Sequence, residues 1–415
     1  MTRSPSNDGA AMPRTLPFKI GRLAPHSILF LALNLLYFMP LAALLIVEYS
    51  VGGTAAAAAL DPETATRIAW VYVAGLLAFL CGSKLKLFHS EPPRQESRLS
   101  LFELNGTFRL LCYATIGIFF LSKVLLVPLG VYSQYAFETE SMVGGIWSFS
   151  MFCSETLLLL SIVVLFSRER RNVKWFLFLS AINAVNLLHG TRIFFFAASF
   201  ALGLYFYLRG ALTFRRASLA ALLLMATGYG VHVSRSNAEV GSETISVAGV
   251  ISPVMYETVF SQLPLIGVVR DSHLWQWFGS PHKFFSDIFY FSAPRFLLPQ
   301  KDTLLFLGQY SDLSPLGAFS GYAAGLLYFG VLFPVLYFVL GSVASWMLNR
   351  ARDSSFWSVI YVYFTCDCLL RVMRDGYIIP AKILVNALVI LSIAVLFAPV
   401  ARHRAAGASA VAGSS

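Results

Sequence analysis

The most constraining feature of this chain is its series of apolar runs, several of which are long enough to cross a lipid bilayer. A membrane-spanning helix needs about 20 consecutive apolar residues. Only 13% of the 415 residues are charged, whereas soluble domains carry about 25%. These properties exclude soluble, fibrous, disordered and disulfide-stapled proteins, and they predict an all-α polytopic membrane protein.

We predict about ten transmembrane helices and no soluble domain between them. The runs lie at 27–47, 67–83, 108–131, 146–167, 175–189, 193–209, 218–233, 320–348, 355–371 and 379–400. The expected organisation is a cytoplasmic tail (1–26), helices one to seven (27–233), a large outer loop (234–319), helices eight to ten (320–400) and a second cytoplasmic tail (401–415).

The net charge of +10 is interpreted as a topology signal. Placing both termini in the cytoplasm puts most lysines and arginines on that side, as the positive-inside rule requires. We therefore expect no nucleic-acid partner. The five cysteines lie mostly in apolar runs without metal-ligand or disulfide spacing, so we expect them to act as small apolar side chains.

The long loop at 234–319 is the expected active side. It contains several prolines but is rich in apolar residues at 247–269 and 284–298. This composition favours short helices that lie at the outer interface over full spans. Long ordered loops in compact chains are usually functional.

Two arginines lie at the outer end of the ninth run, on the side of the membrane where the positive-inside rule predicts few basic residues. Asp367, Arg371 and Arg374 follow one another at i, i+4 and i+7, so they share one face of a helix. We expect Asp367 to support Arg371 through an ion pair. Ionisable groups inside a membrane usually face a cavity or the bundle interior.

The tetrapeptide HGTR at 189–192 supplies the second candidate site. The apolar run before it is too short to cross the bilayer, so we expect this turn to be recessed, with Asn183 and Asn186 as a polar stripe leading to it. His189 and Arg192 are the candidate residues of the turn.

Further arginines in the long loop extend the predicted cluster. Arg270, Arg295 and, as a weaker candidate, Arg235 could join Arg192, Arg371 and Arg374 to bind a diphosphate, because guanidinium groups bind phosphate oxygens bidentately. The outer loops contain no pair of carboxylates that would indicate a site for a divalent ion. We therefore expect neither a metal nor a cofactor. Lys123, Glu155 and Lys382 lie within runs, and we expect them to pair across the bundle without a chemical role.

With these motifs in view, the chain resembles the bacterial O-antigen polymerase (Wzy-type) family, the oligosaccharide repeat unit polymerases. The resemblance covers roughly residues 140–400 and depends on HGTR, the large outer loop, the late arginines and the segment 314–341 with its Tyr328-Phe329-Gly330 element. Relatives often carry a Glu and an Asn around that element, where this chain has Ala324, Gly325 and Leu327.

The resemblance implies a GT-C-like glycosyltransferase of the bacterial inner membrane. It would polymerise undecaprenyl-diphosphate-linked oligosaccharides at the periplasmic face, with the lipid bilayer, a chain-length regulator and a flippase as candidate partners. We expect Arg192, Arg371 and Arg374, with Arg270 or Arg295, to stabilise the departing diphosphate. His189 is the first candidate base, and Glu257 and Asp271 are alternatives.

Two other functions remain open from the sequence. An O-antigen ligase would share the architecture and the arginines but would use a lipid A core as acceptor. A lipid-linked oligosaccharide flippase or another transporter belongs to a different class. Transporters tend to show repeated halves that meet at the midplane, whereas the charged groups here gather toward one face.

Overall fold

The computed structural model of the chain describes residues 24–46, 61–85, 106–126, 141–167, 171–187, 191, 193–208, 263–270, 279–293, 305–307, 319–351 and 354–397. These residues are almost entirely helical. In chain order the elements are α1 (Pro25–Ile46), α2 (Pro62–Lys84), α3 (Gly106–Leu126), α4 (Ser141–Leu165), α5 (Asn172–Asn183), the 3-10 turn η3 (Ala184–Leu187), α6 (Ile193–Leu208), α9 (Pro281–Ser292), α11 (Gly321–Phe329), the 3-10 turn η6 (Gly330–Leu332), α12 (Phe333–Ala351), α13 (Ser355–Tyr363), the π-helical turn η7 (Phe364–Cys368), α14 (Leu369–Asp375) and α15 (Ile378–Phe397).

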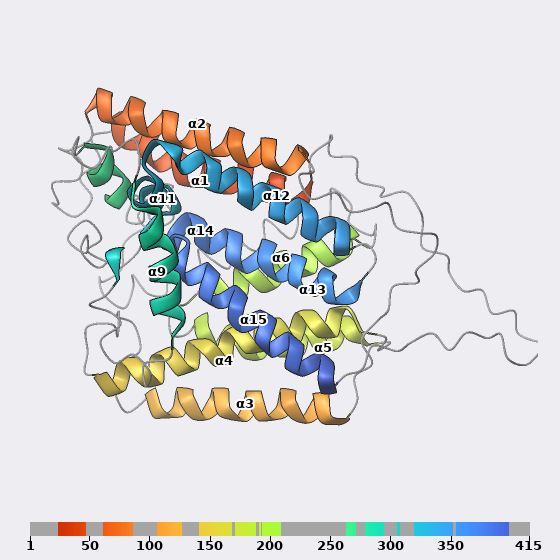
Figure 1. Ribbon diagram of the computed structural model, residues 1–415. Coiled ribbons are helices and arrows are strands. Elements are labelled where there is room, and N and C mark those ends of the chain that lie inside the picture. The colour runs from red at the N-terminus through yellow and green to blue at the C-terminus, as the bar shows by residue number, and fades with distance from the viewer. Residues whose placement is uncertain are drawn as a thin grey trace, which may run out of the picture.

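The helices form a bundle with a short helix across one end. Figure 1 shows α1, α2 and α12 along one side and α3, α4 and α5 along the other, with α6, α13 and α14 between them. In this view α9 runs at a steep angle to the long helices, beside α11 at the left-hand end. The short helices of the predicted large loop thus lie at one end of the bundle.

Five helical stretches in the described part of the chain are long and apolar enough to cross a membrane. They are Pro62–Lys84, Phe108–Leu125, Ile146–Leu165, Gly321–Ala351 and Ser355–Asp375. Shorter apolar helices coincide with the predicted runs 27–47, 193–209 and 379–400, and the run 218–233 lies outside the described residues. The structure therefore indicates a membrane-embedded helical protein, with the predicted count of ten only partly represented.

The outward faces of α2 and α3 carry large apolar side chains. Trp70 on α2 and Leu110 and Val124 on α3 are each about two-thirds exposed, at 67%, 66% and 62%. Soluble proteins rarely expose contiguous apolar surface of this kind. Contact with lipid hydrocarbon gives these faces an environment in which they are stable, in agreement with a membrane location.

Helices α2 and α12 approach closely through glycines. A Cβ atom added at Gly82 would collide with the backbone oxygen of Phe338, and one added at Gly341 would collide with that of Phe79. Ser342 also donates a hydrogen bond to the Gly82 carbonyl oxygen at 3.1 Å. Small residues that let two backbones approach are typical of helix pairs in membranes.

The predicted continuous run 320–348 is interrupted. Helix α11 ends at Phe329, and Gly330 has a φ of +58°, which favours glycine. The Tyr328-Phe329-Gly330 element therefore lies where the short buried helix α11 gives way to η6 and α12. Tyr328 donates a hydrogen bond of 2.6 Å to Asp287 of α9, which connects this break to the helix across the bundle end.

Helix α2 begins with a capped turn. Asp61 accepts hydrogen bonds from the backbone N–H and the hydroxyl of Thr64, both at 2.8 Å. These hydrogen bonds lower the pKa of the exposed Asp61 carboxyl.

The N-terminal boundary of the bundle differs from the prediction. His26, which the sequence places in the cytoplasmic tail, is the second residue of α1 and is fully buried. Its Nδ1 lies 3.1 Å from the hydroxyl of Tyr361, and its Nε2 lies 3.3 Å from the hydroxyl of Ser345. We call these three side chains the His26 cluster; they connect α1, α13 and α12.

The expectation for the large loop is met only in part. A helical segment at 263–270 and α9 are short helices, as the composition indicates. However, the apolar residues Leu265, Ile266, Val268 and Val269 are almost completely buried in the protein. This segment therefore packs into the bundle, whereas α9 exposes Phe285 and Phe289 on its outer side.

Candidate functional site

The predicted ion pair on the ninth run is present. The side chain of Arg371 on α14 donates from Nε to Asp367 Oδ1 at 3.1 Å. Asp367 is fully buried, and Arg371 is only 9% exposed. The pair lies toward one end of its helix, since Arg371 precedes the last residue of α14 by four residues, or about 6 Å along the axis.

The turn that carries Asp367 is not a regular α-helix. Residues 364–368 form the π-helical turn η7 between α13 and α14. Such turns insert one extra residue into a helix and are frequent at functional sites. Within this wider turn, the buried carboxylate of Asp367 lies four residues before Arg371. The two side chains still form the i,i+4 ion pair.

Glu155 of α4 completes the group from the opposite helix. Its Oε1 lies 3.7 Å from Arg371 Nη2, within ion-pair range but beyond hydrogen-bond length. The expected pairing of Glu155 across the bundle is therefore confirmed. Sequence reasoning gave this residue no chemical role; its position within an apolar run was the available signal.

Two aromatic rings from other helices border the same group. The guanidinium carbon of Arg371 lies 5.4 Å from the ring centroid of Phe194 on α6, a cation–π distance. Lys382 on α15 is within electrostatic reach of Glu155, and its ammonium lies 4.7 Å from the ring of Phe291 on α9. We call Glu155, Asp367, Arg371 and Lys382 the Arg371 cluster.

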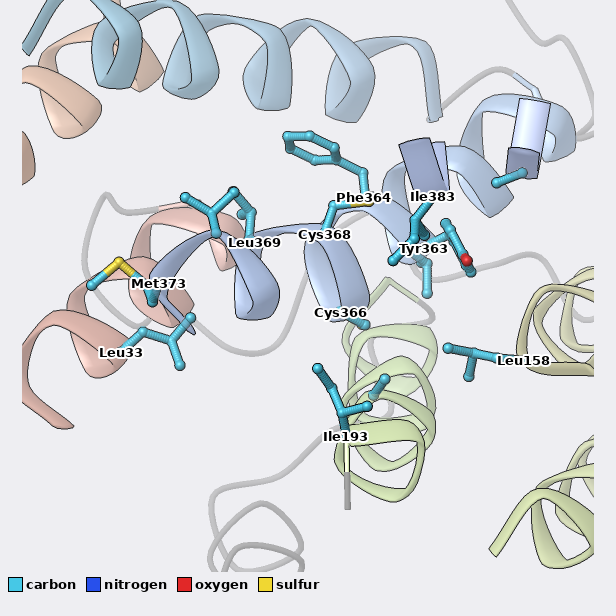
Figure 2. Close-up of a cluster of buried hydrophobic side chains, with 14 of the residues drawn as sticks. Leu33, Leu158, Ile193, Tyr363, Phe364, Cys366, Cys368, Leu369, Met373 and Ile383 are labelled. Atoms are coloured by element: carbon cyan, nitrogen blue, oxygen red, sulfur yellow. The ribbon is translucent and has the colours of Figure 1, made fainter. Parts of the chain in front are cut away.

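A shell of apolar side chains borders η7 and α14, the segments that carry Asp367 and Arg371. Figure 2 shows Cys366 of η7 near Ile193 of α6 and Leu158 of α4. On the other side of the helix, Leu369 and Met373 of α14 lie toward Leu33 of α1. This shell keeps the local dielectric constant low, which strengthens interactions between the charges.

Hydrogen bonding within the Arg371 cluster is incomplete. Arg371 Nη2 and Asp367 Oδ2 are buried and have no hydrogen-bond partner among the described residues. Buried charged groups normally have all their partners, so an open donor beside an open acceptor requires an explanation. The open donor is suited to an anionic oxygen.

Lys123 does not pair as predicted. Its ammonium has no hydrogen-bond partner in the described part of the chain and instead lies 5.3 Å and 5.6 Å from the ring centroids of Phe119 and Trp147. The rings partly compensate the buried charge through cation–π attraction.

The two asparagines that precede the predicted HGTR turn contact α4, while residues 188–190 and 192 of the turn lie outside the described residues. Helix α5 and η3 end beside the middle of α4, where Asn183 donates to the Ser154 carbonyl and Asn186 to the Ser154 hydroxyl, both at 3.0 Å. Thr191 donates its backbone N–H to the Asn186 carbonyl oxygen at 3.0 Å. The two asparagines therefore attach the end of α5 and η3 to α4 at the residue before Glu155.

Several predicted site residues cannot be placed. His189, Arg192 and Arg295 lie outside the described residues, as do the weaker candidates Arg235, Glu257 and Asp271. Of the flanking residues, Thr191 is hydrogen-bonded to Asn186 of η3, and Phe194 borders Arg371.

The remaining arginines differ from Arg371 in burial. Arg270 is the exposed last residue of the helical segment 263–270. The Arg374 side chain is 34% exposed, and its Nε lies 3.7 Å from Asp375. The shared helix face predicted for Arg371 and Arg374 thus includes one buried arginine and one at the more open end of the helix.

The cysteines and potential metal ligands have no special arrangement. All five cysteines are free thiols, and only Cys81 is exposed. Within the described ranges, no three histidine, cysteine or acidic side chains gather as metal ligands.

Comparisons of the chain with known proteins identified no relative. No protein-family model, curated protein or solved structure matches the chain.

Proposed function

We propose that this protein is a glycosyltransferase that polymerises undecaprenyl-diphosphate-linked oligosaccharide repeat units at the periplasmic face of a bacterial inner membrane. The observation that carries the proposal is Arg371, a nearly buried arginine inside an apolar helical bundle. Asp367 holds its Nε, and its Nη2 donor is open. A membrane protein that acts on a lipid-linked diphosphate needs a fixed cation of this kind.

In the proposed reaction, a hydroxyl oxygen of the acceptor sugar attacks the anomeric carbon of the donor chain. The bond from that carbon to the diphosphate oxygen breaks, and the electron pair leaves with the diphosphate. Arg371 stabilises the negative charge that develops on the leaving group. Asp367 fixes the orientation of the guanidinium, so little reorganisation is needed as the charge appears.

A base must accept the proton of the attacking hydroxyl. His189, Glu257 and Asp271 are the candidates from the sequence. Glu155 is a further candidate, because its carboxylate lies beside Arg371 and is 14% exposed. The proton acceptor must reach the acceptor hydroxyl directly or through one water molecule.

The position of the site agrees with a lipid-linked substrate. Val372, next to Arg371, touches the start of α11 at Gly321. Helix α9 lies across the same end of the bundle and exposes Phe285 and Phe289. In the proposed orientation, with both termini in the cytoplasm, this end faces the periplasm, where the repeat units are joined.

The test is complementation of a deletion strain, read as the banding of its surface polysaccharide. Arg371→Ala should reduce the ladder of chain lengths to a single repeat, with the variant protein present in the membrane at the wild-type level. The control is Arg350→Lys, a conservative substitution of an exposed arginine in the last turn of α12. This variant should give a normal ladder.

Other results would identify the alternatives. Complete loss of attached polysaccharide in the deletion strain would indicate a ligase. Accumulation of lipid-linked single repeats on the cytoplasmic side would indicate a flippase. A normal ladder in the Arg371→Ala strain would overturn the assignment of Arg371.

A further inference from the structure

The Nη2 atom of Arg371 is in an unusual position. It is buried and without a hydrogen-bond partner among the described residues. The carboxylate oxygen Oε1 of Glu155 is 3.7 Å away, beyond the length of about 2.7–3.2 Å that a hydrogen bond requires. Asp367 already holds the other side of the guanidinium through Nε. The Nη2 end is therefore suited to an acceptor that comes closer than Glu155.

Glu155 faces a second cation on another helix. Lys382 of α15 attracts its carboxylate, and the Lys382 ammonium is kept near the bundle end by the ring of Phe291 on α9. Two carboxylates and two cations thus face one another in the Arg371 cluster, and the nearby Asp375 is paired with Arg374 at 3.7 Å. Their charges compensate in a medium where an unbalanced charge would be costly.

We propose that Glu155 is the built-in counter-anion of a diphosphate site formed by Arg371 and Lys382, and that the substrate diphosphate displaces its carboxylate. This inference rests on the proposed function and adds Lys382 and Glu155 to the site. An arriving diphosphate supplies the oxygens that Arg371 Nη2 lacks. Glu155 then repels the bound diphosphate, since like charges are destabilising at short range.

This arrangement has a consequence for turnover. The diphosphate that remains on the lipid carrier after glycosyl transfer carries more charge than the diphosphate ester of the substrate. Glu155 therefore opposes the product more strongly than the substrate and favours its release. Removing the charge of Glu155 should tighten product binding, whereas removing either cation should weaken it.

The change in diphosphate affinity caused by Glu155→Gln distinguishes a counter-anion from a proton acceptor and from a purely structural residue. If Glu155 were the proton acceptor, Glu155→Gln would abolish polymerisation and leave the affinity for diphosphate nearly unchanged. If Glu155 only stabilised the fold, the same substitution would lower the unfolding temperature and leave the affinity unchanged. Tighter binding is expected only for a counter-anion.

The experiment measures binding of inorganic pyrophosphate to the full-length protein in lipid nanodiscs by titration calorimetry, without added metal. Glu155→Gln should lower the dissociation constant by about tenfold, which corresponds to about 1.4 kcal/mol. Lys382→Gln and Arg371→Gln should each raise it by tenfold or more. Lys123→Gln is the matched control, since it removes a buried lysine beside Phe119 and Trp147 and should leave the affinity unchanged.

Unchanged or weaker binding by the Glu155→Gln variant would overturn the inference, as would no binding by either this variant or the wild type. Thermal unfolding of each variant in the same nanodiscs verifies that it is folded. The failure of the proposed function looks different. Pyrophosphate binding with the predicted order of affinities, together with a normal polysaccharide ladder in the deletion strain itself, would retain the anion site and reject the polymerase.

Discussion

Two of the buried polar clusters in the bundle share one helical stretch and differ in the charge of their side chains. Tyr361 of the His26 cluster and Asp367 of the Arg371 cluster are six residues apart on the segment Ser355–Asp375. The His26 cluster consists of side chains that can all be neutral. The Arg371 cluster consists of four ionisable side chains whose charges oppose one another.

The two clusters also differ in how completely their hydrogen bonds are made. The hydroxyl of Ser345 donates to the Ser83 carbonyl oxygen at 2.6 Å, so His26 Nε2 donates to Ser345 and His26 Nδ1 accepts from Tyr361. Every polar atom of this network has a partner. In contrast, Arg371 Nη2 and Asp367 Oδ2 have none among the described residues.

This comparison separates stability from function. A complete neutral network gains its hydrogen bonds in the folded state and leaves nothing for a ligand. An incomplete charged network is costly unless a ligand completes it. We therefore expect substitutions in the His26 cluster to change the free energy of unfolding, and those in the Arg371 cluster to change the rate of the proposed reaction.

The largest effect is expected from Arg371→Lys. Lysine keeps the charge, which limits the loss of stability, but it lacks the planar fork that reaches both Asp367 and an anionic oxygen. Removing one preorganised donor to a developing charge lowers the rate by about 10²–10³-fold. The measurement is the initial rate of polymer formation from lipid-linked repeat units, per folded molecule. A rate within threefold of the wild type would place Arg371 outside the reaction.

A smaller effect on the rate is expected from Asp367→Asn. The amide oxygen can still accept the Nε–H of Arg371, but it no longer fixes the guanidinium by charge. We expect a decrease of about tenfold, because the orientation of the guanidinium becomes less certain. The assay is the same, with Asp287→Asn as a control for a buried aspartate whose hydrogen bonds are with Tyr328 and the backbone of Phe306. A decrease as large as that of Arg371→Lys would give Asp367 a direct role in the reaction.

The sequence predicts those parts of this comparison that depend on local spacing. The apolar runs predict the five long helices, and the i,i+4 spacing predicts the Asp367–Arg371 pair. Both follow from the period of a single helix. The break at Gly330 has a local signal, a glycine within the run, but glycine also occurs within continuous membrane helices.

The contacts between distant helices could not be predicted in the same way. Glu155 and Arg371 are separated by more than two hundred residues, and no local period indicates which helices become neighbours. His26 has the sequence surroundings of a polar tail, yet tertiary packing places it in the core. The π-helical turn η7 likewise depends on how α13 and α14 pack against α6 and α15.

On the structural side of the comparison, His26→Phe should lower the free energy of unfolding by about 1–3 kcal/mol, because the Tyr361 hydroxyl is left buried without its partner. The polymerisation rate per folded molecule should not change. The double variant His26→Phe/Tyr361→Phe should recover part of the loss, since replacing both partners by apolar groups is nearly neutral. Additive losses in this double-mutant cycle would mean that the two side chains do not interact.

The smallest effect is expected from Ser345→Ala. This substitution removes the hydrogen bond to the Ser83 carbonyl and the acceptor of His26 Nε2. His26 Nε2 is then a buried donor without its acceptor, for which we expect a loss of about 1 kcal/mol, at the low end for such groups, because the alanine leaves little empty volume. The unfolding midpoint in nanodiscs should therefore fall slightly, while the affinity for pyrophosphate and the polymerisation rate remain at wild-type values. A change in affinity or rate would show that the two clusters communicate along Ser355–Asp375, and the separation between stability and function would then fail.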